Sequence, residues 1–284
     1  MRRLVLLLLI TLLALGAPAC GETDDLRERG EALRQRAEAA RDRAERSARR
    51  VVDRVRAELE RLEQAVPEAT RDEQAPASGD ARLEDYLTEV LRSVDAYWTR
   101  TLAQAGMAEP RVSFLWVPPG RAARSGCGAV ADEKAAFYCP TDDTIFVGEA
   151  LASDILRGTG GNFPGEQQGQ GRARGDFGLA YVIAHEYAHN VQHELGLARV
   201  DPRYGVEPLE LQADCMAGLW GNSVYRAGRL KPGDVEEAIS TVLAAGDFDT
   251  SNPQHHGTPE ERRAAWLLGY RSGDPSRCGD VAGV

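Results

Sequence analysis

The chain has 284 residues and a formal net charge of −10. This length suffices for one sizeable hydrophobic core with accessory segments. The negative charge argues against nucleic-acid binding that relies on a basic surface.

The N-terminus is typical of an export signal. Two arginines precede an apolar run from Leu4 to Leu15, and Ala17-Pro18-Ala19 follows directly before Cys20. The run is too short, and wrongly flanked, for a membrane span. We expect residues 1–19 to be a signal peptide and Cys20 to carry the lipid of a bacterial lipoprotein, with simple secretion as the alternative. The expected location is the cell envelope, on its periplasmic face or at the cell surface, with the membrane as a partner through Cys20.

Residues 22–66 are rich in Arg, Glu and Ala, and apolar side chains recur every three, four or seven positions. This spacing predicts a long charged helix of coiled-coil type, weak because the middle of its apolar stripe is alanine. Residues 20–66 would then form a stalk that allows self-association, or a solvated helix that only spaces. The composition of residues 67–79 indicates a linker, which leaves residues 80–284 for the folded domain.

A helix and a small sheet are predicted at the start of this domain. Asp80 is a suitable N-cap, and the following apolar positions keep helical spacing: Leu83, Leu87, Val90, Leu91, Val94 and Trp98. Three short apolar segments predict strands at 112–117, 136–139 and 144–147.

A short helix is expected at residues 149–156, and a Gly- and Gln-rich loop occupies residues 158–175. The loop is either a lid or a simple insertion. Asp176 is the predicted N-cap of the helix that follows, beside which we expect the sheet to lie.

The segment 179–195 carries the motif on which the functional prediction depends. It contains His185-Glu186-x-x-His189 after an apolar run, and Gly196 follows as a helix terminator. On a helix both imidazoles lie on one face, where they can bind one Zn2+, and Glu186 can act as general base towards water. The alternative is a core helix with satisfied polar groups. A buried His–Glu–His cluster without a partner would be costly, which favours the metal.

A second helix is predicted from Glu207-Pro208, with the proline in its first turn. Glu210 follows His189 by 21 residues, and Asp214 lies one turn further on the same face. We expect Glu210 to be the third metal ligand and Asp214 to hold a ligand histidine in its tautomer. The third histidine of a metzincin is absent, because its position is Leu195. An amphipathic helix with two exposed acids is the alternative.

The C-terminal part contains two further predicted helices. The first begins at Lys231-Pro232 and ends at Gly246, and the second begins with a capping box formed by Thr258 and Glu261. His256 precedes this second helix and Arg262 lies within it, so either could donate to the oxyanion of a tetrahedral intermediate. For His256 a structural or surface role is the alternative. We expect His193 and His255 to be incidental.

Four cysteines remain besides Cys20. In an exported protein they predict two disulfides, for which three connectivities are possible. We prefer Cys127–Cys139, which closes a short local loop, and Cys215–Cys278, which ties the tail to the helix of Glu210. Free buried thiols are the alternative.

These motifs resemble those of a bacterial family of neutral zinc metallopeptidases, zincins whose third ligand is a glutamate. The resemblance covers roughly residues 80–278 and includes, in order, Phe137–Pro140, Gly175–Phe177, Ala180–Glu186, His189, Val191-Gln192, Leu209–Cys215, His256–Thr258, Arg262 and Trp266. Where the family tends to have Gly-His-His, this chain has Ala188-His189-Asn190, which keeps the ligand. The resemblance implies a zincin-like α+β domain but identifies no substrate.

Together these features predict an α+β fold: a zincin-like domain with a small β-sheet and a metal-binding helix pair, preceded by a long charged N-terminal helix. The predicted function is a zinc-dependent endopeptidase of the bacterial cell envelope that acts on proteins or peptides. The alternative is an envelope interaction or assembly protein whose zinc site is structural or vestigial. A hydrolase of peptidoglycan stem peptides is a third option that no sequence feature selects.

Overall fold

The computed structural model describes residues 81–160, 163–200, 205–279 and 281. These residues fall within one compact unit. The signal peptide, the lipid-bearing Cys20, the stalk of residues 20–66 and the linker of residues 67–79 lie outside the described residues, so these expectations stay predictions.

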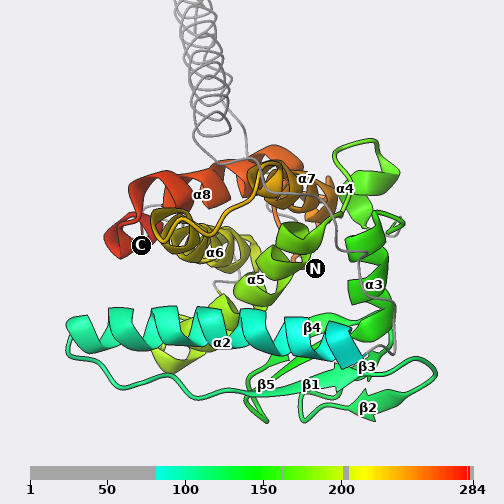
Figure 1. Cartoon of the computed structure of the whole chain (residues 1–284), viewed down its shortest axis with the longest axis horizontal. Helices are drawn as coiled ribbons and strands as arrows, with labels where there is room; N and C mark the ends of the chain where they lie inside the picture. Colours follow the sequence, from blue (N-terminus) through cyan, green and yellow to red (C-terminus); the bar gives the residue numbers. More distant parts are fainter. Residues whose placement is uncertain (1–80, 161–162, 201–204, 280, 282–284) are drawn as a thin grey trace, which may run out of the picture. The chain divides into compact units, whose positions relative to one another are not determined.

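The described part has the expected α+β composition, with seven α-helices, a three-stranded sheet and a two-stranded sheet. Figure 1 shows helix α5 (Asp176–Glu194) at the centre of this part. Helix α2 and the strands lie on one side of α5, and α6, α7 and α8 lie on the other. None of the helices in the described ranges combines the length and the apolar character that crossing a bilayer requires.

Helix α2 (Ala81–Gln104) confirms the helical spacing read from the sequence. The six predicted apolar residues are buried, together with Leu102. This stripe packs against α5, and the exposed face carries the charged residues, as expected for an amphipathic helix on a core.

The three predicted strands form one sheet in the order β1-β5-β4. Strand β1 (Ser113–Val117) runs parallel to β5 (Thr144–Gly148), and β4 (Ala136–Cys139) pairs antiparallel with β5 through a tight hairpin. Strand β4 is therefore an edge strand, and it packs against α5 as predicted. The second sheet, β2 (Ala122–Arg124) with β3 (Val130–Asp132), was not predicted.

Helix α3 (Glu149–Arg157) follows β5 directly, as expected. The glycine-rich stretch after it contains a short helix, α4 (Pro164–Gln167), that packs against α7 (Asp234–Ala245). The approach is close, because a Cβ atom on Gly165 would lie 2.3 Å from the carbonyl oxygen of Leu243. This part of the stretch thus packs against the core.

Helix α6 (Glu207–Arg226) and helix α8 (Pro259–Ser272) form the tightest pair. A Cβ atom on Gly269 would lie 1.9 Å from the carbonyl oxygen of Cys215, and one on Gly218 would lie 2.1 Å from that of Trp266. Only glycine allows this approach. The predicted disulfide Cys215–Cys278 joins α6 to the terminal 3-10 helix (Pro275–Cys278), and the other predicted pair, Cys127–Cys139, is also present.

Two predicted helix starts were wrong by one to three residues. The N-cap of α5 is Gly175, with φ of +79°, and Asp176 is the first helical residue. Helix α7 begins at Asp234 and not at Lys231-Pro232, because Gly233 adopts φ of +98° and interrupts the helical path. The capping box of Thr258 and Glu261 is confirmed at α8.

Candidate metal centre

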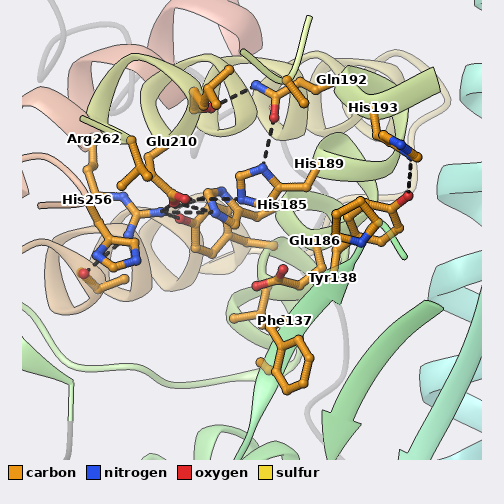
Figure 2. Close-up of a pocket in the computed structure, with 18 of the residues that line it drawn as sticks. Phe137, Tyr138, His185, Glu186, His189, Gln192, His193, Glu210, His256 and Arg262 are labelled. Atoms are coloured by element: carbon orange, nitrogen blue, oxygen red, sulfur yellow. Dashed lines mark hydrogen bonds and ion pairs between the residues drawn. The ribbon is translucent and has the colours of Figure 1, made fainter. Parts of the chain in front are cut away.

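Helices α5 and α6 bring three potential ligands together. His185 and His189 lie one turn apart on α5, and Glu210 lies in the first turn of α6. The Nε2 atom of His185 is 3.1 Å from Glu210 Oε2, and that of His189 is 3.4 Å from Glu210 Oε1. Figure 2 shows the three side chains pointing towards one another.

The chemistry and the spacing of these three donors fit zinc. Imidazole nitrogen and carboxylate oxygen are common zinc ligands. Around a tetrahedral ion with bonds of about 2.0–2.1 Å, neighbouring donor atoms are separated by roughly 3.3 Å. The observed separations of 3.1 and 3.4 Å bracket this value. Each imidazole nitrogen thus lies at about this spacing from one carboxylate oxygen of Glu210, and the three ligand atoms lie within 4.8 Å of one another.

Each histidine is oriented by a contact on its other ring nitrogen. His185 Nδ1 lies 2.9 Å from Asp214 Oδ1, and His189 Nδ1 lies 2.8 Å from Gln192 Oε1. Acceptors at Nδ1 favour the tautomer whose Nε2 carries the free lone pair. Both Nε2 atoms, which face Glu210, are therefore the ones available for a metal.

Asp214 is completely buried and sits within a polar network. It accepts hydrogen bonds from Tyr181 Oη at 2.6 Å and from Arg262 at 2.8 Å (Nε) and 3.1 Å (Nη2). Arg262 is 4% exposed and also lies 3.9 Å from Glu210 Oε2. The guanidinium of Arg262 is thus engaged with Asp214, and its Nη2 atom lies 3.5 and 3.4 Å from Nδ1 and Nε2 of His185.

The electrostatic field of the cluster favours positive charge at the imidazoles. Burial lowers the pKa of His185, but the carboxylates of Asp214 and Glu210 outweigh burial and raise this pKa to about 10. Burial raises the pKa of Glu210, whereas the two neighbouring histidines hold it well below its usual range. A bound cation would replace the histidine protons, so metal and protons compete for this site.

A cavity of about 480 Å3 opens beside the cluster. Glu186, from the same helix as the two histidines, lines it and is 9% exposed. Figure 2 shows Glu186 between the histidines and the β4 residues Phe137 and Tyr138, which also line the cavity. His256 lines it as well, with half of its side chain exposed.

Two residues near the site form contacts that were not predicted from the sequence. Gln192 holds His189 and itself donates to the carbonyl oxygen of Leu209 at 2.8 Å. Its position three residues after His189 on the same helix face is the signal that could have found it. His193, expected to be incidental, lines the cavity and lies 3.0 Å from Tyr138 Oη.

Comparison with known proteins identifies relatives of this chain and its family. The chain is 36% identical to "Uncharacterized protein YpfJ" of Escherichia coli K12 over 177 residues, which cover 55% of this chain and 57% of that protein. It is 31% identical to "Uncharacterized protein Rv2575" of Mycobacterium tuberculosis H37Rv over 212 residues, 66% of each chain. The match thus spans little more than half of the Escherichia coli relative. No solved structure is significantly similar. Residues 53–281 match the family described as "Putative neutral zinc metallopeptidase", and the chain belongs to this family.

Proposed function

We propose that this protein is a zinc-dependent endopeptidase of the bacterial cell envelope, with a zincin-like catalytic domain. The observation that carries the proposal is the convergence of His185, His189 and Glu210 beside a cavity that Glu186 also lines. Family membership supports the same chemistry.

The number of donors favours a catalytic site over a structural one. Structural zinc sites commonly use four protein ligands, whereas catalytic sites use three and keep a position for water or substrate. Here three donors face an open cavity. When bound, zinc would polarise the scissile carbonyl and make the attacking water more acidic.

Glu186 is the proposed general base. It would take a proton from the attacking water and deliver it to the amine that leaves when the peptide bond breaks. Its position on α5, between the two histidines in sequence, keeps its carboxylate beside the same cavity. His256 on the cavity wall is the proposed donor to the oxyanion, a role that Arg262 is less free to take while it binds Asp214.

Strand β4 offers a place for an extended substrate. It is an edge strand, so its outer backbone groups are not paired within the sheet, and Ala136, Phe137 and Tyr138 line the cavity. A peptide backbone can add to such an edge as a further strand. A protein or peptide segment in extended conformation is therefore the proposed substrate class.

The two disulfides support the proposed location. Disulfides persist in oxidising compartments such as the bacterial periplasm and the cell surface. Cys127–Cys139 and Cys215–Cys278 thus agree with the export signal and with the lipid anchor proposed at Cys20.

Digestion of an unbiased peptide library by the full chain tests the activity. We expect cleavage that a chelator abolishes and that added Zn2+ restores. Glu186→Gln should retain zinc but lower the cleavage rate about 10²–10⁴-fold, because it removes the general base. Glu194→Gln is the matched control, since it makes the same change on an exposed residue of the same helix. Full activity of Glu186→Gln would refute the mechanism.

The same experiment separates the enzyme from its alternative. An interaction or assembly protein with a structural or vestigial site would cleave nothing in the library even when its metal centre is fully loaded. Metal content must therefore be measured on the sample used for digestion.

A further inference from the structure

We propose that Glu207, His255 and Glu261 form a second site for a divalent metal ion, distinct from the centre of His185. One ring nitrogen of His255 and one carboxylate oxygen of each glutamate lie within 4.8 Å of one another. The three residues come from the start of α6, from the loop after α7 and from the first turn of α8. Neither the family description nor the proposed function includes such a site.

The burial and the hydrogen bonding of His255 indicate a ligand independently of the cluster geometry. This side chain is 4% exposed, and its buried Nε2 atom has no hydrogen-bond partner. A buried polar atom without a partner costs about 1–3 kcal/mol, so such atoms are rare unless something binds them. A metal ion at Nε2 would remove this cost.

Asp247 prepares Nε2 for this role. Its Oδ1 atom lies 2.5 Å from His255 Nδ1, which favours the tautomer with the proton on Nδ1 and the lone pair on Nε2. Asp247 is itself held by the backbone N–H groups of Asp249 at 3.1 Å and His256 at 2.8 Å. This carboxylate–histidine pair is the arrangement that usually orients a metal-ligating histidine.

The chemistry of the three donor groups indicates which class of ion would bind. One imidazole with two carboxylates suits Zn2+ and similar transition metals, whereas Ca2+ and Mg2+ prefer oxygen donors alone. Glu207 is half-buried. Glu261 is exposed, and its Oε2 atom accepts from the backbone N–H and the hydroxyl of Thr258 in the capping box, which leaves Oε1 for an ion. Small rotations of the two side chains can shorten the 4.8 Å span to the spacing that one ion needs. Each side chain starts from a fixed helix terminus, which limits the required movement.

A metal at this position would hold together the chain segments that lead to the centre of His185. Glu207 lies one turn before Glu210 on α6, and His255 is the neighbour of His256. The backbone N–H of Val206 already donates to the carbonyl oxygen of Pro253 at 3.1 Å, so the start of α6 lies against this loop. The second site would thus fix the loop relative to the helix that carries Glu210.

Metal stoichiometry tests the inference without reference to activity. The full chain, with its disulfides intact, is stripped with a chelator and equilibrated with Zn2+ at buffered free concentrations, and bound zinc is counted by mass spectrometry. We expect two equivalents for the wild type and one each for His255→Gln and His189→Gln. If only His189→Gln loses an equivalent, the second site is refuted while the proposed enzyme stands. If only His255→Gln loses one, the second site stands and the proposed zinc centre of the enzyme is refuted.

A pair of glutamate variants covers the case in which His255→Gln does not fold. Glu207→Gln should weaken binding of the second equivalent at least about tenfold, because it removes a ligand. Glu260→Gln makes the same chemical change on the exposed neighbour of Glu261 and should leave both equivalents unchanged. Equal zinc affinities in Glu207→Gln and Glu260→Gln would overturn the assignment. Thermal unfolding in chelator checks that both variants are folded.

Discussion

The cluster of His185 and the cluster of His255 differ in how completely the protein supports their histidines. In the first, each histidine has a partner at Nδ1, and each Nε2 faces Glu210, all from the packed helices α5 and α6. In the second, one histidine stands in a loop, its Nδ1 is held by Asp247, and its Nε2 is buried without a partner. The first cluster is pre-organised by helix packing, whereas the second depends on an ion to close it.

This difference has an energetic consequence. The support of the first cluster lies in the core, where Asp214 and Arg262 form a fully buried ion pair. Removing one partner of such a pair leaves a buried charge uncompensated. The support of the second cluster lies at the surface, because the Asp247 side chain keeps 18% of its surface exposed. Replacing Asp214 should therefore lower the free energy of unfolding more than replacing Asp247.

Replacement of Asp214 is the strongest test of this difference. We expect Asp214→Asn to lower the free energy of unfolding by about 3–5 kcal/mol, because it removes the nearer of the two carboxylates that face the buried guanidinium of Arg262. Zinc affinity should also fall about 10–100-fold, since His185 loses the charged acceptor that orients its ring and raises its basicity. Denaturant unfolding of the zinc-free protein and chelator titration measure the two effects.

Asp247→Asn is the matched variant in the other cluster. It should cost less unfolding free energy than Asp214→Asn and should affect only the second zinc equivalent. Equal destabilisation by both variants would contradict the distinction between core and surface support.

Helix α8 belongs to both regions, which allows them to be disturbed together. Gly269→Ala would place a methyl group 1.9 Å from the carbonyl oxygen of Cys215 and push α8 away from α6. We expect a loss of about 1–3 kcal/mol in unfolding free energy, as for other overpacked cores. Because α8 carries both Arg262 and Glu261, the affinity for both zinc equivalents should fall.

Gly221→Ala is the control on the facing helix, where a Cβ atom meets only side chains, the nearest at 3.3 Å. The gain in helix propensity of about 1 kcal/mol should offset this milder contact. A Gly269→Ala protein as stable as Gly221→Ala would show that the α6–α8 approach is not constrained as the structure indicates.

The contrast between the two clusters also explains what the sequence could predict. His185 and His189 are four residues apart on an apolar helix, so their proximity follows from helix geometry alone. The α2 stripe and the capping box at Thr258 were likewise predictable from local spacing, and they are confirmed. The cysteine count predicted two disulfides and left three connectivities open, and the structure has the preferred one. The roles assigned to Glu186, Glu210, Asp214 and His256 stay predictions.

Features that depend on contacts between distant segments were missed. The gathering of Glu207 and Glu261 around His255 was not predicted, because these residues approach one another only in the folded chain. The β2–β3 hairpin has three-residue strands with mostly exposed side chains, too short for a periodic pattern. The predicted start of α7 was wrong because the backbone conformation of Gly233 cannot be read from its neighbours.

A third cluster, at the N-terminus of α5, provides the smallest and most specific test. Asp176, Asp234 and Glu237 gather there without a histidine. Burial and the nearby Asp176 raise the pKa of Glu237 to about 7, and burial raises that of Asp234 to about 6. Lys231, Tyr86 and Tyr270 also interact with these carboxylates. We expect protons to neutralise the charge of this cluster, whereas metal ions are proposed for the two histidine clusters.

Because these pKa values are raised on folding, the protonated carboxyls stabilise the fold at low pH, and this contribution is lost as the pH rises through about 6 to 7. Glu237→Gln keeps an acceptor for the backbone N–H of Phe177 but removes the charge. We expect the variant to be about 1 kcal/mol more stable than the wild type at pH 8, a value reduced for solvent screening, which raises Tm by about 2–4 °C. At pH 4 the two proteins should unfold together. Glu84→Gln, on the exposed face of α2, is the control and should show no such pH dependence. If Glu237→Gln changes Tm by the same amount at both pH values, protonation is excluded as the cause.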